Sequence, residues 1–480
     1  MRFKKGKKLI STVLAGAALF TMGLSGCGEK TASSDTYTID WYIVCGTAPS
    51  NVEHVEKAAD EYLKDKLNVN IKLNYLSWAA YTERINVLNA GGEKYDIAWD
   101  SGDGYRLNSA KNAYLPLNDL MDKYAPKTKE IIGEDFLKGS QINGKNYGIP
   151  ANKDKGSSPG FLYRTDLAEK YNLTEKLENV KKYEDLFPIL DVIKEKEPSI
   201  SPLFQNHNSN TSILDRFDTL AFPVGVFVEG NDKVINYIES DKYKEMCKQS
   251  SENVRKGYMK KGIKEEEENF FVEIMGLKPG KDNELNGNRK YKWKQVSLGE
   301  PTMTNGDATG SLMCISRTSE QPELVMQFLE LFNTDEYLHN LIVFGVENVD
   351  YTKNEDGTIT PSKDSGYGNA GMQWIFGNTF LDYTVEGEDP QKAKLTEEFN
   401  NTVKASPAAG FVVDNETIKT EVGACQNVMI EFKGRLADGA DDYESLLNEY
   451  ISKLKAAGSE KIMEEVNKQY EEWKSKNTNK

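Results

Sequence analysis

Two short motifs in this 480-residue chain carry residue types that enzymes use, and neither has the surroundings that catalysis needs. The stretch G-S-S-P-G at 156–160 fits the nucleophile elbow G-x-S-x-G, which sets a serine between a strand and a helix. Here polar N-K-D-K precedes the motif and strand-like F-L-Y-R follows it, so we expect a loop. Four glutamates at 265–268 could supply the carboxylate pair of a glycoside hydrolase, but such a run is more typical of a solvated surface.

Metal and nucleotide sites are not indicated either. The stretch D-S-G-D-G at 100–104 has the oxygen donors of a calcium loop, but it lacks the spacing and the distal glutamate of an EF-hand. The three histidines, His54, His207 and His339, lie far apart and form no i, i+4 pair that would suit zinc. No G-x-x-x-x-G-K-[ST] phosphate loop is present. The sequence therefore predicts no catalytic residue, no metal and no cofactor, and we expect the protein not to be an enzyme.

The N-terminus has the parts of an export signal. Basic residues precede an apolar run over 9–24, which is shorter than the eighteen or so apolar residues of a membrane-spanning helix. The following L-S-G-C resembles a bacterial lipobox, in which the cysteine is diacylated and becomes the first residue of the mature chain. This resemblance implies a signal peptide over 1–26, a lipid on Cys27 and a flexible polar tether over 27–35. An ordinary signal peptide with a chance cysteine is the alternative.

Composition limits the possible partners. The formal net charge is −15, and it becomes −20 once the five basic residues of the signal are removed. An acidic chain argues against nucleic acid as a partner, because phosphate binding needs clustered lysine and arginine. The four cysteines after Cys27 sit in or beside apolar segments, which favours buried free thiols, although export allows one or two disulfides. These are Cys45, Cys247, Cys314 and Cys425.

Strand-like and helix-like segments alternate through the first part of the chain. The β-rich segments lie at 36–46, 69–78 and 95–99. Stretches with the apolar period of helices lie between them, and this alternation predicts βα units on a largely parallel sheet. We expect the region 225–305 to be loop-rich and the chain to end in two helices over 442–474.

Several longer stretches carry a family resemblance. They are A-Y-L-P-L-N-D-L-M-D-K-Y-A-P (113–126), I-N-G-K-N-Y-G-I-P (142–150), Y-R-T-D-L-A-E-K-Y-N-L (163–173) and the segments 315–352, 410–432 and 447–473. Together they resemble the extracytoplasmic solute-binding proteins of bacterial ABC importers, in the large oligosaccharide-binding group found as lipoproteins in Gram-positive bacteria. The last two segments resemble a subgroup with a C-terminal, DUF3502-like domain of unknown function. The stretch D-N-E-L-N-G-N-R-K-Y-K-W-K-Q (282–295) departs from the family pattern.

The resemblance implies a fold and a set of partners. The fold would be the α/β, two-lobe periplasmic-binding-protein-like fold of type II, with the ligand in a cleft between lobes that are joined by crossover strands. The partners would be an oligosaccharide and the ABC permease subunits. The protein would be a monomer, held on the outer face of the cell membrane by its lipid alone. The expected boundaries are 36–150 and 308–360 for lobe one, 151–307 and 361–480 for lobe two with the C-terminal helices, and 147–151 and 310–316 for the crossover strands.

Sugar recognition needs flat aromatic rings and polar side chains that converge on hydroxyl groups. Trp41 and Trp473 lie in strand and helix patterns that favour packing in a core. The remaining tryptophans follow strands, a glycine-rich stretch or the middle region, where contact with ligand is as plausible as packing. The candidate ligand-binding residues are Trp78, Trp99, Asp100, Ser101, Asp103, Tyr105, Trp293 and Trp374, with Tyr163, Gly46 and Thr47 as weaker candidates.

The sequence thus predicts a lipid-anchored binding protein that captures an oligosaccharide and delivers it to an ABC permease. Two alternatives stay open at this point. The same fold could bind a peptide or another small solute, which would need paired charges at the two ends of the cleft. A surface-anchored glycoside hydrolase would need two carboxyl groups about 5–10 Å apart in the cleft.

Overall fold

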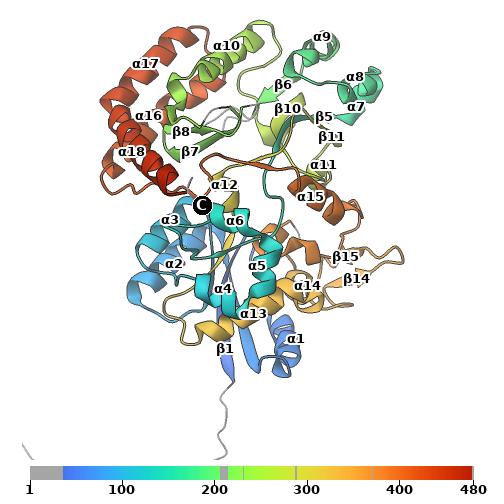
Figure 1. The fold of residues 1–480 in the computed structure, drawn as a ribbon. Coiled ribbons are helices and arrows are strands. Elements are labelled where there is room, and N and C mark those ends of the chain that lie inside the picture. The colour runs from blue at the N-terminus through green and yellow to red at the C-terminus, as the bar shows by residue number, and fades with distance from the viewer. Residues whose placement is uncertain (1–35, 206–214, 231, 287–288, 370, 478–480) are drawn as a thin grey trace, which may run out of the picture. The chain divides into compact units, whose positions relative to one another are not determined.

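The computed structural model describes residues 36–205, 215–230, 232–286, 289–369 and 371–477 (Figure 1). The predicted signal peptide, Cys27 and the tether lie outside these residues, and so does His207. Mixed α/β structure extends over the described chain, in two lobes that are built on separate sheets.

Five strands form the sheet of the first lobe, in the order β2-β1-β3-β13-β4. Their bounds are β1 (Tyr37–Cys45), β2 (Val69–Ser77), β3 (Ile97–Asp100), β13 (Leu312–Ile315) and β4 (Ile149–Pro150). β1 pairs in parallel with β2 and β3, whereas β13 runs antiparallel to β3 and β4. Both faces of this sheet are covered, and its inner strands β3 and β13 are almost wholly apolar. The carboxyl ends of β1, β2 and β3 meet the start of β13 at one edge of the sheet.

Helices follow the strands of the first sheet and bury its faces (Figure 1). They are α1 (Glu53–Lys64), α2 (Trp78–Gly91), α3 (Gly102–Ala110), α4 (Asn118–Tyr124), α5 (Pro126–Ile132), α6 (Glu134–Gly139), α13 (Pro322–Thr334) and α14 (Glu336–Phe344). Helix α2 ends at Gly91, because Gly92 adopts the left-handed conformation (φ 65°) that caps helices. The hairpin of β14 (Tyr351–Lys353) and β15 (Ile359–Pro361) extends this lobe, and two short 3₁₀ turns, Gln373–Ile375 and Thr379–Leu381, follow it.

The core of the first sheet continues beyond residue 360. Tyr367, Ile375 and Phe376 are buried in it, and the ring of Phe376 lies 6.0 Å from that of Trp41. These residues fall in the segment that the sequence assigned to lobe two. The lobe boundaries stay a prediction, but a boundary drawn from this packing lies after Phe376.

The second lobe has a four-stranded sheet in the order β11-β5-β10-β6. Its strands are β11 (Trp293–Ser297), β5 (Ser158–Arg164), β10 (Phe270–Leu277) and β6 (Ser201–Gln205). β10 and β6 are parallel, and β5 runs antiparallel between β10 and β11. The shorter elements around it are α7 (Thr165–Lys170), α8 (Thr174–Glu178), the 3₁₀ turns Tyr183–Leu186 and Glu265–Glu267, α9 (Phe187–Lys196) and α11 (Lys281–Asn286).

A third core joins residues from the middle and the end of the chain. Helices α10 (Asp241–Arg255), α16 (Lys419–Ala437), α17 (Tyr443–Ala456) and α18 (Ser459–Asn477) pack with a small sheet of β7 (Phe217–Ala221), β8 (Val224–Phe227) and β9 (Ile235–Asn236), which a 3₁₀ turn, Tyr237–Glu239, follows (Figure 1). The prediction of a loop-rich region over 225–305 is therefore wrong. Its helix α10 has a buried face at helical spacing, which includes Tyr243, Cys247, Ser250 and Ser251, but half of these residues are polar, and this weakens the apolar pattern in the sequence.

Two segments connect the two sheets, and a third leads from the first lobe to the third core. The predicted crossover strands, 147–151 and 310–316, contain β4 and β13 of the first sheet, and the first two segments adjoin them. The chain leaves β4 for β5 over 151–157 and returns over 298–311 through β12 (Thr302–Met303) and α12 (Asn305–Ala308). The third segment contains α15 (Lys392–Asn400) and β16 (Lys404–Ala405), and β16 pairs in parallel with β12. This third segment was not predicted from the sequence, because its position beside the second segment depends on the pairing of β16 with β12.

Candidate ligand-binding site

Three of the predicted tryptophans lie together at the carboxyl edge of the first sheet. Trp78 begins α2 directly after β2, Trp99 lies in β3, and Trp374 comes from the 3₁₀ turn Gln373–Ile375. The rings of Trp78 and Trp374 are nearly parallel, at 13°, with centroids 6.1 Å apart. The Trp99 ring stands across both, 5.3 Å from Trp78 at 86° and 6.0 Å from Trp374 at 80°. We call these three residues the tryptophan cluster.

The tryptophan cluster presents an apolar face to solvent. The Trp78 side chain is 45% exposed, which is unusual for so large an apolar group, and Trp99 and Trp374 are partly buried. Ring distances of 4.5–7 Å with stacked or perpendicular planes are the favoured arrangements of aromatic pairs. The cluster therefore holds a broad aromatic face open at an edge of a parallel sheet, where α/β proteins bind their ligands.

The other candidates after β3 have structural partners. Asp100 is 8% exposed and accepts hydrogen bonds from Asn108 (2.7 Å) and Tyr114 (2.6 Å); burial nevertheless raises the pKa of its carboxyl. Tyr105 is fully buried and donates to the Ser140 carbonyl (2.9 Å). These two side chains hold α3 and the following loop against the sheet.

Four further candidates are accessible to solvent, two at the start of α3 and two after β1. Ser101 is the N-cap residue of α3, and the Asp103 side chain is 89% exposed and pairs with Arg106 (3.1 Å). Gly46 and Thr47 are exposed immediately after β1. Because Cys45 is the register partner of Ser77, this exposed pair begins beside the residue that precedes Trp78.

Trp293 and Tyr163 are distant from the tryptophan cluster in the fold, since both belong to the second sheet. Trp293 is 2% exposed, packs against Phe270 at 5.2 Å and donates its indole N–H to Glu268 (3.1 Å). Tyr163 is 1% exposed, and within the described chain its hydroxyl has no hydrogen-bond partner. Neither ring has a face free for a sugar.

A polar cavity lies at the carboxyl end of β6, and it was not predicted from the sequence. It has a volume of about 260 Å³ and is lined among others by Tyr183, Gln205, Asp215, Lys242 and Gln249. Gln205 is the register partner of Ile274, so the cavity opens where two parallel strands run side by side. Its lining comes from four separate elements, so no single stretch of the sequence indicates it.

A larger cavity, of about 720 Å³, lies away from the tryptophan cluster. It is lined by α4, α5, α6 and the loop after them, including Met121, Lys129, Glu134 and Asn146. It contains no aromatic ring on which a sugar could stack. We therefore place the candidate site at the tryptophan cluster and not in this cavity.

The motifs that resembled catalytic sites have structural roles. In G-S-S-P-G, Ser157 pairs with Thr302 in a β-bridge, and Ser158 begins β5, so no strand–turn–helix elbow exists there. In the glutamate run, Glu265 pairs with Arg289 (2.8 Å), and Glu268 accepts from the Trp293 indole and from two backbone N–H groups. Two members of the predicted solvated run thus anchor the stretch 289–293 to the second sheet.

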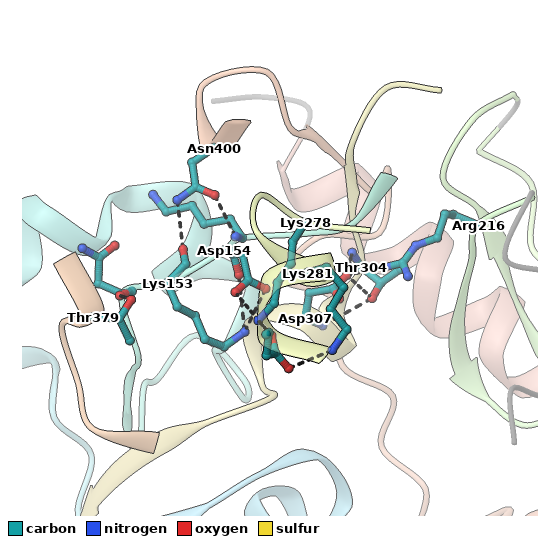
Figure 2. Close-up of polar contacts among 12 residues, drawn as sticks. Lys153, Asp154, Arg216, Lys278, Lys281, Thr304, Asp307, Thr379 and Asn400 are labelled. Carbon is teal, nitrogen blue, oxygen red and sulfur yellow. Dashed lines mark hydrogen bonds and ion pairs between the residues drawn. The ribbon is translucent and has the colours of Figure 1, made fainter. Parts of the chain in front are cut away.

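The connecting segments carry a network of polar contacts (Figure 2). Asp154 accepts from Lys153 (3.5 Å) and from Lys278 (3.2 Å) at the end of β10. Asn400 donates to the Lys153 carbonyl (2.9 Å). Further along, Arg216 pairs with Asp307 of α12 (2.5 Å; Figure 2). The first and third connections therefore contact each other, and each of these contacts ties a connection to a neighbouring element.

No three His, Cys, Asp or Glu side chains of the described ranges are grouped so that they could hold a metal ion. No helix within those ranges is long and apolar enough to cross a membrane. Cys45, Cys247, Cys314 and Cys425 are buried free thiols, as the composition favoured.

Two family models match the chain. Residues 48–272 match the bacterial extracellular solute-binding protein family, and residues 407–475 match a domain of unknown function, DUF3502. A carbohydrate ABC transporter substrate-binding protein of Streptococcus pneumoniae serotype 4 (strain TIGR4) is 29% identical over 98% of this chain and 99% of that protein.

Solved structures agree with these matches. The N-glycan transport solute binding protein NgtS of Streptococcus pneumoniae is 28% identical, with a TM-score of 0.79 over 91% of this chain and 99% of that one. NgtS in complex with Man5GlcNAc matches with a TM-score of 0.67 at 26% identity, over 92% and 99% of the two chains. With the type II, two-lobe α/β fold, these matches show that the chain is similar to bacterial extracellular solute-binding proteins over residues 48–272 and to the DUF3502 domain over residues 407–475.

Proposed function

We propose that this protein captures a neutral oligosaccharide outside the cell and delivers it to the permease of an ABC importer. The observation that carries the proposal is the tryptophan cluster, with Trp78 exposed at the carboxyl edge of the first sheet. Sugar rings present apolar C–H faces to such surfaces. The similarity to a carbohydrate substrate-binding protein and to NgtS, which was solved with mannose-containing glycans, supports the same class of ligand.

The second lobe would supply polar contacts. The cavity beside Gln205 offers amide, hydroxyl and charged groups in a space of about 260 Å³, a little below the usual range of ligand pockets and close to the size of a single sugar ring. A ligand that contacts both lobes favours the closed arrangement, because only there can both sets of contacts form. The permease would then recognise the closed arrangement as the loaded protein. The ligand would leave chemically unchanged, since the protein acts as a carrier and not as an enzyme.

The lipid anchor belongs to the same proposal. Diacylation of Cys27 would keep the protein on the outer face of the membrane, because two acyl chains give stable anchoring whereas one binds only marginally. The test is metabolic labelling with a radioactive or alkyne-bearing fatty acid. Label on the native chain and its loss in Cys27→Ser support the anchor, whereas equal labelling of both overturns it.

Calorimetric titration tests the ligand class. The chain from residue 28 onward, which keeps every described element, is titrated with Man1GlcNAc, Man5GlcNAc, other neutral and acidic oligosaccharides, and peptides. One sugar bound per chain at micromolar Kd or tighter, recovered unaltered, supports the proposal. Binding of peptides alone overturns the sugar assignment, and product formation overturns the role as a carrier.

Substitution of Trp78 locates the site. A tryptophan buries up to about 250 Å², so the 45% that is exposed offers about 110 Å² to a ligand, worth at most about 3 kcal/mol. Trp78→Ala should therefore weaken binding by up to about 100-fold. Trp473→Ala, the same change at a half-buried position in α18, is the matched control and should leave Kd unchanged. Equal affinities for Trp78→Ala and the native chain would remove the tryptophan cluster from the site.

A further inference from the structure

The two parallel rings of the tryptophan cluster stand too close to hold a sugar between them. A ring in contact with two aromatic faces needs about 3.5–4.0 Å on each side, or about 7–8 Å between the faces. The centroids of Trp78 and Trp374 are 6.1 Å apart at 13°. A sugar can therefore stack only on an outer face of the cluster, and the 45% exposed ring of Trp78 offers that face.

Trp99 packs against both parallel rings, Trp78 and Trp374. Its ring meets Trp78 nearly at a right angle, with centroids 5.3 Å apart, and meets Trp374 in the same manner at 6.0 Å. Trp99 is therefore the common neighbour of the two parallel rings. Any rotation of its indole changes the surface against which both rings pack.

Two hydrogen bonds fix Trp99. The Tyr81 hydroxyl donates to the Trp99 backbone carbonyl (2.7 Å), which holds the main chain at the end of β3. The Trp99 indole N–H donates to the Ser311 hydroxyl oxygen (2.9 Å), which sets the orientation of the ring itself. The first contact would survive a rotation of the ring, and the second would not.

The strand register explains why Ser311 reaches this indole. Trp99 is the register partner of Met313, so Ser311, two residues earlier, lies on the same face of the sheet at the diagonal position. Ser311 is 3% exposed, and its own carbonyl accepts from the Ala151 N–H (2.9 Å). The acceptor is therefore held in place by the first connecting segment.

We propose that Ser311 is a positioning residue for ligand binding, which fixes the Trp99 indole and through it the ring of Trp78 on which the sugar stacks. This inference rests on the proposed function. Without the hydroxyl, the indole N–H loses its acceptor and Trp99 can adopt other orientations. Binding must then order the tryptophan cluster, which lowers the affinity although no residue that touches the sugar has changed.

The test compares Ser311→Ala with Ser109→Ala in the chain from residue 28 onward. Ser109 is a matched control because it is buried in the same lobe, and among the described residues its hydroxyl has no hydrogen-bond partner. Both variants are titrated with the oligosaccharide of the panel that binds the native chain most tightly. We expect Kd to rise about three- to tenfold for Ser311→Ala, the range of one lost hydrogen bond, and to stay unchanged for Ser109→Ala.

A spectroscopic readout separates positioning from a general loss of stability. The chain has six tryptophans, so labelling with 5-fluorotryptophan gives six ¹⁹F signals, assigned by single Trp→Phe substitutions. In the unliganded protein, Ser311→Ala should shift or broaden the signals of Trp99 and Trp78, while those of Trp293 and Trp473 stay in place. Saturating sugar should bring the Trp78 signal of Ser311→Ala toward the position that it has in the sugar-bound native chain.

The outcomes distinguish the two proposals. If the native chain binds no oligosaccharide, the proposed function fails and this inference fails with it. If the native chain binds and Ser311→Ala binds equally well, the inference alone is overturned. It is also overturned if Ser311→Ala weakens binding while the ¹⁹F signal of Trp78 is unchanged, because the effect then does not pass through the cluster.

Discussion

Asp218 should make the stability of this protein depend on pH in a direction opposite to that of most carboxyl groups. It lies in β7, is 2% exposed, and accepts hydrogen bonds from the backbone N–H (3.2 Å) and the side-chain amide (3.1 Å) of Asn305 in α12. Burial raises the pKa of Asp218 to about 6 from an ordinary value of 3.8, and the nearby charge of Asp307 adds to this, whereas contacts with Ser406 and Asn305 and the charge of Arg106 oppose it.

The sign follows from proton binding. Between about pH 4 and pH 6 the folded chain holds a proton on Asp218 that the unfolded chain has lost, so raising the pH through this range favours the unfolded chain. The shift of about two pKa units corresponds to about 3 kcal/mol, at 1.36 kcal/mol for each unit. This contribution to stability is fully present below pH 4 and is lost above pH 6.

Asp218→Asn isolates the contribution. The amide cannot ionise, keeps an oxygen for the two donors of Asn305 and gains N–H groups that can donate to the Ser406 hydroxyl. Urea denaturation is followed by tryptophan fluorescence at pH 4, 5, 6 and 7.5. We expect the free energy of unfolding of the variant, relative to the native chain, to rise by up to about 3 kcal/mol across this range.

Asp103→Asn is the matched control, because that side chain is 89% exposed. Its difference from the native chain should stay constant from pH 4 to 7.5. A constant difference for Asp218→Asn as well, or one that falls as the pH rises, would show that the carboxyl is not buried uncharged against Asn305.

Two further predictions concern buried groups away from the tryptophan cluster. Glu268→Ala removes the acceptor of the Trp293 indole N–H and of two backbone N–H groups, so chemical denaturation should show a loss of about 2–4 kcal/mol, whereas Glu266→Ala, a neighbouring exposed position, should change little. If Glu268→Ala is as stable as the native chain, Glu268 does not anchor the stretch 289–293. The four buried thiols should react with a thiol reagent only after unfolding, because burial raises the pKa of each; rapid reaction of any of them in the native chain would contradict the packing around Cys45, Cys247, Cys314 and Cys425.

Part of the tryptophan cluster could be predicted because the positions of its strands are encoded locally in the sequence. Trp78 and Trp99 each end a β-rich segment, and parallel neighbouring strands bring their carboxyl ends to one edge. Trp374 could be predicted only as a residue that returns toward this edge, since its place depends on the packing of Ile375 and Phe376 in the first core. The pairing of these rings was not accessible, because ring angles depend on contacts between residues nearly three hundred positions apart.

Trp293 shows why sequence context misled elsewhere. Its neighbours Lys292 and Lys294 suggest an exposed position, yet alternation along β11 turns those lysines outward and the indole inward. The acceptor that makes its burial favourable, Glu268, lies in a run that reads as a solvated surface. Only tertiary structure pairs the two, so neither residue alone signals the role of the other.

The second connecting segment, 298–311, contacts both the tryptophan cluster and the first connecting segment. Ser311 accepts from the Trp99 indole through its hydroxyl and from the Ala151 N–H through its carbonyl, while the neighbouring Thr309 carbonyl accepts from Gly102 at the start of α3. A rotation of this segment must either carry the Trp99 ring with it or break the 2.9 Å contact to Ser311. The orientation of the Trp99 ring therefore depends on the geometry of the second connecting segment. If the cluster binds sugar as proposed, a ligand that orders these rings would also favour one arrangement of the lobes.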